Sequence, residues 1–464
     1  MPKKPPNILF FGIDSLRRDH MSHYGYGRLT TPHITKYAEG GVTFENCFSA
    51  HIPTSSGYSN MLTGRDCFGT GVVALRHVGQ IAEGVPTLAE ILRDHGYVST
   101  SVGYEGNPGS RGFDKYLHFQ SWFAETPDGR IPKAMNLNQT AIPELERLSK
   151  GKKPFFLFLR HMEPHSPYLA PEPFQSMFFQ GDAFDKNDDR MKKVYDFKPF
   201  GDFIKSWTPE GCTNPDYVIA QYDAEIAYMD ACIAHILEKL SQLGLEENTL
   251  VVFASDHGET LYDHDCHFDH HGLYDPTLVV PLIFKWKGKL PGGIRRADTC
   301  QLKDVTPTIL DVIGLDTGTP FDGRSLYPLV KGEPRDAEPE IYITECTWMR
   351  KHGWRTPEWK LIRALEPDFH FKPEIELYNL IKDPGENFNA ADENPEIVEA
   401  LTKRMNAHIK KREKETGRPN PMYTNVNWHG GTCGAFKTSK QAYETMYIGS
   451  INTAMQLQQK DKKA

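Results

Sequence analysis

The sequence predicts an α/β fold in which a mostly parallel central sheet lies between layers of helices. The first observation is a set of apolar runs without polar alternation, as expected of strands buried on both faces. The second is that residues 85–96 and 216–244, which lie between such runs, have apolar spacings of three and four and end near a glycine, as helices do. Strands that alternate with helices favour parallel pairing. The five runs are 7–13, 97–104, 154–161, 249–256 and 279–286.

The chain after residue 335 predicts a second, smaller unit. Its segments "IYITECTWMR", "EWKLIRAL" and "EIELYNLIKD" indicate a small antiparallel sheet, and the charged helical segment "NPEIVEALTKRMNAHIKKREKETG" follows. We therefore expect a large α/β catalytic domain over 1–335, a small α+β subdomain over 336–417 and an extended C-terminal arm over 418–464. The polar arm suits either contact within a homo-oligomer or a disordered tail. Residues 170–215 lack clear periodicity and predict an excursion over one face, a lid or a substrate wall.

Composition and charge exclude several classes of partner. The chain has 464 residues, of which 39% are hydrophobic and 25% charged, as in globular proteins. Its net charge of -8 argues against nucleic acid or an anionic membrane as the main partner. No apolar run reaches the roughly 18 residues of a membrane span, and the first run ends in Asp14 without a cleavage site, so a buried strand fits it better than a signal peptide. The eight cysteines form no CxxC pair, which favours free thiols and a cytoplasmic protein.

Polar residues at the ends of three predicted strands indicate a metal site. Asp14 follows the first run, Asp256 and His257 lie at the end of the fourth, and His161 and His165 lie at and beyond the end of the third. Ligands bind outside the carboxyl ends of the strands of an open α/β sheet, so these side chains should meet at one edge. A single acid there would more simply be a helix N-cap. Three such strand ends favour a divalent cation, with manganese or zinc ahead of calcium or magnesium because of the imidazoles.

Thr54 is the candidate nucleophile of this site. It precedes "SSGYSNMLTG", a predicted helix, so its hydroxyl should lie at the positive end of that helix, where anions are favoured. Contact with a metal would lower the pKa of the hydroxyl and make it nucleophilic. A capping role alone is the alternative interpretation.

Residues 256–275 contain an unusual density of aspartate and histidine. A solvated polar loop explains several of these residues. The imidazoles could also supply a second metal, a cationic clamp or a general acid. One metal site is predicted, and His264, His267 or His271 would complete a second.

Several ordered motifs resemble those of the sulfatase branch of the alkaline phosphatase superfamily. "MLTGRD" is similar to the end of its nucleophile helix, "FLFLRHMEPHSPY" to its central histidine motif, "VVFASDHGE" to its second metal motif and "ELYNLIKDPGENFNAAD" to its C-terminal signature. The resemblance runs along most of the chain and implies a hydrolase that acts on a small anionic ester with a divalent metal. The metal ligands that it implies are Asp14, Thr54, Asp256 and His257.

The resemblance also implies roles around the metal. Thr54 matches the nucleophile, His165 matches a group that contacts the transferred anion or the leaving oxygen, and His270 stands where a lysine is frequent. We therefore predict these three residues as catalytic. The residues predicted to bind substrate are Tyr58, Tyr104, Asn107, His77 and His161.

The nucleophile motif departs from the sulfatase pattern. Sulfatases convert a cysteine or serine within C/S-x-P-x-R to formylglycine, whereas this chain has "TSSGY" at 54–58. Oxidation of a threonine would give a ketone, and the proline and arginine are absent, so we predict no formylglycine. Ser15 also stands where the paired acid of many sulfatases would follow Asp14. Threonine is the nucleophile of phosphodiesterases and phosphotransferases in the same superfamily.

The predicted pocket has few fixed positive charges. Three positions at which relatives place cations contain Tyr58, Tyr104 and His270. A less cationic pocket should fit a monoanion better than a dianionic phosphate monoester. We therefore predict metal-dependent hydrolysis of a phosphodiester or phosphonate monoester through Thr54. The alternatives are a sulfatase of unusual chemistry, a phosphotransferase or mutase, and a non-catalytic homologue.

Overall fold

The computed structural model describes residues 5–75, 80–121, 131–335, 339–425 and 436–447. It contains an eight-stranded central sheet in the order β5-β4-β6-β1-β7-β8-β2-β9. All neighbours pair in parallel except β8, which is antiparallel to both β7 and β2. The predicted α/β fold with a mostly parallel sheet is confirmed. The strands are β1 (Asn7–Ile13), β2 (Val42–Phe48), β4 (Val98–Val102), β5 (Lys115–Leu117), β6 (Phe155–His161), β7 (Thr249–Ser255), β8 (Val279–Lys285) and β9 (Ile294–Gln301).

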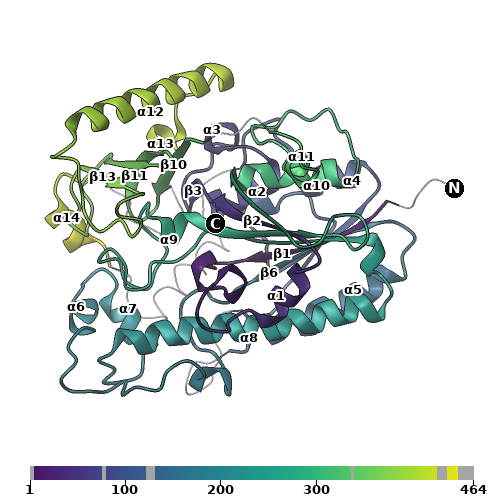
Figure 1. The fold of residues 1–464 in the computed structure, drawn as a ribbon, viewed down its shortest axis with the longest axis horizontal. Coiled ribbons are helices and arrows are strands. Elements are labelled where there is room, and N and C mark those ends of the chain that lie inside the picture. Colours follow the sequence, from purple (N-terminus) through teal and green to yellow (C-terminus); the bar gives the residue numbers. More distant parts are fainter. Residues whose placement is uncertain (1–4, 76–79, 122–130, 336–338, 426–435, 448–464) are drawn as a thin grey trace.

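Helices cover both faces of this sheet (Figure 1). One layer contains the long helix α8 together with α5 and α1, and the other contains α2, α4, α10 and the short α11. Each helical layer buries apolar side chains that alternate along the central strands, because successive residues of a strand point to opposite faces. The bounds are α1 (Pro32–Ala38), α2 (Thr54–Thr63), α4 (Leu88–Asp94), α5 (Lys133–Ser149), α8 (Pro215–Gln242), α10 (Val305–Val312) and α11 (Tyr327–Val330).

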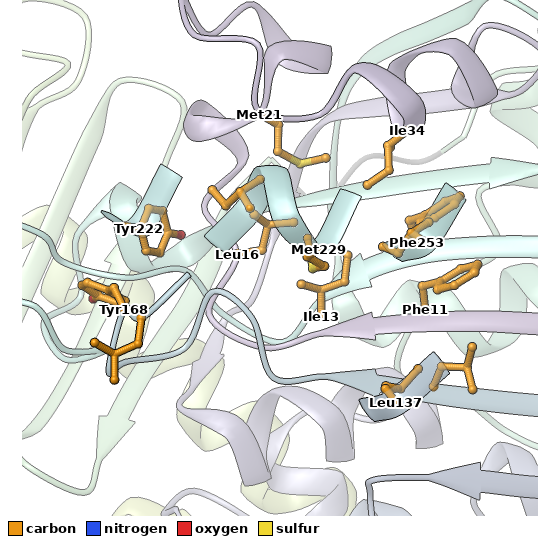
Figure 2. Close-up of a cluster of buried hydrophobic side chains, with 14 of the residues drawn as sticks. Phe11, Ile13, Leu16, Met21, Ile34, Leu137, Tyr168, Tyr222, Met229 and Phe253 are labelled. Atoms are coloured by element: carbon orange, nitrogen blue, oxygen red, sulfur yellow. The ribbon is translucent and has the colours of Figure 1, made fainter. Parts of the chain in front are cut away.

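The alternation is clear on β1, which lies near the middle of the sheet. Phe11 and Ile13 join the cluster that includes Met229 of α8, whereas Phe10 joins the cluster on the α2 side. Phe11 stacks on Phe253 of β7 with ring centroids 4.8 Å apart (Figure 2). Burial of this continuous apolar surface fixes the register of β1 against its two neighbours.

A second sheet of five strands has the order β13-β12-β11-β10-β3 and is mostly antiparallel. Its first member in the sequence, β3, comes from the N-terminal half and pairs in parallel with β10, with His51 opposite Thr344. The predicted small antiparallel sheet is confirmed, and β3 joins it to the start of α2, where Thr54 lies. The elements are β3 (His51–Ile52), β10 (Ile341–Cys346), β11 (Arg350–Arg355), β12 (Trp359–Ala364), β13 (Ile375–Asn379) and the covering helix α12 (Pro395–Thr416).

The described part of the C-terminal segment lies against its own chain. Residues 418–425 include α13 (Pro421–Thr424), where the carbonyl of Met422 accepts hydrogen bonds from Arg350. Residues 436–447 include α14 (Ser439–Thr445), which contacts the excursion that we predicted between 170 and 215. These residues are therefore not extended away from the body, and assembly through this segment stays a prediction. The remaining elements are η1 (Arg18–His20), η2 (Ser22–Tyr24), α3 (Cys67–Thr70), η3 (Pro108–Ser110), η4 (Phe174–Ser176), α6 (Lys192–Tyr195), α7 (Gly201–Lys205), η5 (Glu246–Asn248), α9 (Asp275–Leu278) and η6 (Leu302–Asp304).

Two further sequence predictions concern membrane and thiol chemistry. Among the described residues, no helix combines the length and apolarity needed to cross a bilayer. Seven cysteines lie in the described ranges, and all seven are buried free thiols. The eighth, Cys433, lies outside the described residues. The cytoplasmic location stays a prediction.

A buried charge cluster stabilises the second sheet. Lys351 Nζ lies 2.8 Å from Asp368 Oδ2 and 2.9 Å from Glu376 Oε1, and the three side chains are almost fully buried. Glu376 Oε2 also accepts hydrogen bonds from the hydroxyls of Tyr274 and Tyr378. The lysine therefore balances two carboxylates that water cannot reach.

Replacing Lys351 with methionine is expected to destabilise the fold by about 3–5 kcal/mol, because it leaves buried carboxylates without a cation. The midpoint of urea unfolding measures this loss. Lys192→Met is the matched control, since Lys192 is exposed and pairs only with Asp196 on the surface, and it should change the midpoint little. Equal midpoints for the two variants would contradict the stabilising role of the buried cluster.

Candidate active site

The carboxyl ends of β1 and β7 bring three of the predicted metal ligands together. Ile13 pairs with Ser255, so Asp14 and Asp256, the next residue of each strand, leave the sheet side by side. Asp14, Asp256 and His257 are fully buried, and one ligand atom from each lies within 4.8 Å of the others. His257 Nε2 is 3.5 Å from Asp256 Oδ2 and 3.7 Å from Asp14 Oδ1.

The orientation of His257 directs a lone pair at Thr54. His257 Nδ1 lies 2.8 Å from the carbonyl oxygen of Gly258, which can only accept, so Nδ1 carries the proton. Nε2 is then the unprotonated nitrogen, and it lies 3.0 Å from Thr54 Oγ1. A backbone carbonyl that fixes the tautomer in this way is the usual support of a metal-binding histidine.

Close approach of helix α2 to β7 places Thr54 in this cluster. Thr54 is the first residue of α2. Three residues later, a Cβ atom built on Gly57 would lie 2.3 Å from the backbone oxygen of Asp256. Only glycine therefore lets the helix pack this close to the end of β7. The backbone contact explains the glycine inside the motif and the position of the hydroxyl.

The four groups fit a divalent cation. Asp256 Oδ1 accepts hydrogen bonds from the backbone N–H groups of Ser15 and His257, but Oδ2 has no hydrogen-bond partner among the described residues. Two carboxylates, one imidazole lone pair and the Thr54 hydroxyl thus face a common point, and oxygen with nitrogen donors suits manganese or zinc.

The charges of the two carboxylates also favour a cation. Burial opposes ionisation of Asp14, but Arg160, His165 and His257 together hold the pKa of that carboxyl well below its usual value. For Asp256, burial and the neighbouring charge of Asp14 raise the pKa to about 7. Two buried carboxylates this close repel each other when both ionise, and a bound cation would remove that cost.

Arg160 is a site residue that the sequence interpretation missed. It lies on β6, its guanidinium pairs with Asp14 Oδ2, and its side chain is 15% exposed. The guanidinium carbon lies 5.9 Å from the ring centroid of Tyr58 and 5.7 Å from that of Tyr104, within cation–π range. The signal was a cation inside the apolar run 154–161, directly before His161.

Tyr58 and Tyr104 contact the site through Arg160. Both rings are buried, and their centroids are 4.7 Å apart. They stand where the sequence comparison expected relatives to have cations, and the structure places a cation, Arg160, next to both rings. Their direct contact with substrate stays a prediction.

The other three predicted substrate residues have different placements. Asn107 Oδ1 accepts a hydrogen bond of 2.9 Å from Ser55, the neighbour of Thr54, so Asn107 lies close to the predicted nucleophile. His161 is fully buried at the end of β6, and neither ring nitrogen has a hydrogen-bond partner among the described residues. His77 lies outside the described residues.

The two predicted catalytic histidines face each other beside His257. The rings of His165 and His270 are 5.1 Å apart, and those of His257 and His270 are 4.9 Å apart. His165 Nδ1 donates a 2.7 Å hydrogen bond to the carbonyl of Ser166. Burial lowers the pKa of His270 to about 3. An anion in the site would favour the protonated form of either imidazole.

Residues 256–275 form two additional clusters of metal-binding groups. Glu259, Asp269 and His270 are buried, with one ligand atom of each within 4.8 Å, so they border the catalytic site and could hold a second cation. His271 instead belongs to a cluster with Cys266 and His370. The other two candidates for a second site lie in neither cluster, and both contact tyrosine rings: His264 at Tyr274 and His267 at Tyr262.

A buried acid next to His165 is expected to make folding stability depend on pH. Lys133 Nζ lies 3.2 Å from Glu225 Oε2 and donates to the backbone oxygen of His165. Burial raises the pKa of Glu163 to about 8, against the attraction of Lys133 and with repulsion from Glu225. The ammonium of Lys133 pairs with Glu225, and burial disfavours a charge on Glu163, so Glu163 favours its neutral form in the fold.

The pKa of Glu163 is higher in the folded state than its unfolded value of 4.5. Its contribution to the stability of the fold is therefore fully present below pH 4.5 and is lost as the pH rises through 8. The variant Glu163→Gln should therefore be more stable than the parent at pH 9, with a difference that shrinks towards pH 5. Urea unfolding at several pH values measures this trend. Glu172→Gln, on the exposed segment before Ser176, is the control. If the stability difference between Glu163→Gln and the parent did not vary with pH, the raised pKa of Glu163 would be wrong.

A buried threonine hydroxyl, two carboxylates and an imidazole at the carboxyl edge of a mostly parallel sheet are typical of metal-assisted hydrolases that act on anionic esters. Comparison with known families agrees. The model of the Sulfatase family matches residues 6–315, and the model described as N-sulphoglucosamine sulphohydrolase, C-terminal, matches residues 263–415. The chain belongs to the sulfatase family, a family of ester hydrolases in the alkaline phosphatase superfamily whose members use a divalent metal.

Individual relatives include both phosphorus and sulfur enzymes. The multifunctional alkaline phosphatase superfamily protein PehA of Trinickia caryophylli is 27% identical over 417 residues, which cover 72% of this chain and 79% of PehA. The choline-sulfatase of Rhizobium meliloti is 26% identical, with coverage of 82% and 83%. The phosphonate monoester hydrolase of Agrobacterium radiobacter shares the fold with a TM-score of 0.69 at 19% identity, over 88% of this chain and 96% of that protein.

Proposed function

We propose that this protein hydrolyses a phosphodiester or phosphonate monoester, with Thr54 as the nucleophile. The observation that carries the proposal is the placement of Thr54 Oγ1, 3.0 Å from His257 Nε2 and beside the converging carboxylates. A serine or cysteine at this position could become formylglycine, but a threonine could not. The hydroxyl itself is then the group that attacks.

The charge around Thr54 supports a monoanionic substrate. Arg160 is the fixed cation beside the metal-binding residues, and Asp14 already neutralises part of its charge. The two aromatic rings in contact with its guanidinium, Tyr58 and Tyr104, are neutral. A dianionic phosphate monoester would need more positive charge to offset its desolvation than a diester or phosphonate monoester does.

The reaction begins with an in-line attack by Thr54. Oγ1 loses its proton to solvent and forms a bond to phosphorus while the bond from phosphorus to the leaving oxygen breaks. His257 Nε2 and Thr54 Oγ1 lie 3.0 Å apart, so the fold holds Oγ1 beside the metal-binding groups before attack. His165 or His270 gives a proton to the leaving oxygen. Water then attacks phosphorus and gives a proton to the same histidine, the bond to Oγ1 breaks, and Thr54 takes up a proton from solvent.

A divalent cation held by Asp14, Asp256, His257 and Thr54, with manganese or zinc favoured by the ligand set, would supply Lewis-acid stabilisation of the charge that develops on phosphorus. The protein's own contribution is a buried, pre-oriented site. Arg160 adds a guanidinium that can donate to a non-bridging oxygen, since its Nε has no hydrogen-bond partner among the described residues.

A direct comparison of substrates tests the proposal. Protein loaded with manganese or with zinc would be assayed on an aryl phosphodiester, an aryl phosphonate monoester, an aryl phosphate and an aryl sulfate that share one leaving group. We expect the highest kcat/KM for the diester or the phosphonate, and loss of turnover after chelation. Preference for the sulfate would support the second candidate, an atypical sulfatase, which the choline-sulfatase relative favours.

A further inference from the structure

We propose that Cys266, His271 and His370 form a second, structural zinc site that joins the active-site loop to the second sheet. This site goes beyond the proposed function, because none of the three residues takes part in the reaction. Cys266 and His271 lie on the loop that follows β7, and His370 lies on the connection between β12 and β13. The two histidines are 99 residues apart in the sequence.

The three side chains converge on one point. Cys266 is fully buried and His271 is 1% exposed, and one ligand atom from each of the three residues lies within 4.8 Å of the others. The Nε2 atoms of His271 and His370 are 2.7 Å apart. A hydrogen bond between the two rings would account for that distance, and Cys266 places a third possible metal ligand within reach of both imidazoles.

Thiolate sulfur and imidazole nitrogen are both zinc ligands, and three protein ligands leave one position of a tetrahedral site for water. The surroundings support this assignment. Asp269 Oδ1 lies 3.8 Å from His271 Nδ1, beyond hydrogen-bond distance, so it places a negative charge beside the ring whose Nε2 faces His370.

Aromatic rings enclose the cluster on the side of the 170–215 excursion. Phe197 stacks on His370 with ring centroids 4.8 Å apart, and Phe200 stacks on His271 at 5.3 Å. Both phenylalanines come from the segment that contains α6 and α7. A metal here would therefore join two segments, the loop after β7 and the β12–β13 connection, and the excursion would pack against its ligands.

The site would also position the catalytic loop. Asp269 and His270 directly precede His271, and His270 faces His257 across the active site. A metal on His271 would limit motion of that loop without touching the substrate. We expect loss of this metal to lower the stability of the fold more than it lowers turnover.

Cobalt substitution tests the proposal with a spectroscopic signal that does not depend on activity. Wild-type protein would be freed of metal, reloaded with Co²⁺ and examined by absorption spectroscopy. The proposal predicts a thiolate-to-cobalt charge-transfer band in the near ultraviolet, because only this cluster offers a thiolate among the candidate metal groups of the described residues. Cys266→Ser should abolish the band. Cys232→Ser, which removes a buried thiol from α8, should retain it.

A second ligand variant and a measurement of bound metal complete the test of the zinc site. His370→Ala should weaken or abolish the same band if Cys266→Ser fails to fold. Metal analysis of Asp256→Asn should show that the cluster keeps its zinc when the catalytic site is impaired, so failure of the proposed function and failure of this site are distinguishable. A wild-type spectrum without the thiolate band, or a band that survives in both Cys266→Ser and His370→Ala, would overturn the zinc site.

Discussion

Turnover of Thr54→Ala is expected to fall by at least about 10⁴-fold, because removal of a nucleophile removes the covalent route and not merely one contact. The ligand atoms of Asp14, Asp256 and His257 remain in place, so the metal content at saturating concentration should stay close to that of the parent. The rate constant for release of the aryl leaving group and the metal content of the same sample measure both effects.

Two neighbouring substitutions serve as controls. Thr54→Ser keeps a hydroxyl at the same position and should retain much of the turnover. Ser56→Ala deletes another buried hydroxyl of α2, one without a hydrogen-bond partner among the described residues, and should change the rate little. If Thr54→Ala turned over substrate at a rate near that of the parent, an external water would have to be the attacking group and the mechanism would be wrong.

The convergence of Asp14, Asp256 and His257 could be predicted from the sequence for a physical reason. Asp14 and Asp256 each follow a long apolar run, and parallel strands present their carboxyl ends at one edge, so the placement follows from the pattern. The adjacent His257 comes with Asp256. The local sequence places each of these residues at a strand end. The only topological fact needed in addition is that β1 and β7 are parallel neighbours.

Features that depend on long-range pairing could not be predicted in the same way. Strand β3 has only two residues, and it forms because it pairs with β10. The paired residues His51 and Thr344 are nearly three hundred positions apart in the sequence. His370 gave no signal, because nothing local connects it with Cys266. Arg160 gave a visible signal, but an arginine at a strand end can point to either face, and only the register of β6 with β1 shows that it meets Asp14.

Arg160 is expected to control both rate and substrate choice. Replacing it with methionine keeps much of the apolar volume over Tyr58 and Tyr104 but removes the charge, and we expect kcat/KM to fall by about 10²–10³-fold, as after loss of one donor to a developing oxyanion. The ion pair with Asp14 adds a second effect. Without the guanidinium the pKa of Asp14 should rise, so metal affinity should weaken at low pH.

The choice between dianionic and monoanionic substrates separates the contact of Arg160 with substrate from its effect on metal affinity. At saturating metal only the contact with substrate remains, and a dianion interacts more strongly with a cation than a monoanion does. Arg160→Met should therefore lose more activity on the aryl phosphate than on the aryl phosphodiester, whereas Arg160→Lys should retain part of both. Arg404→Met, on the exposed face of α12, is the control. Equal losses on the two substrates at saturating metal would mean that Arg160 acts only through Asp14, as a positioning residue for the metal, and that charge selection in this pocket has another source.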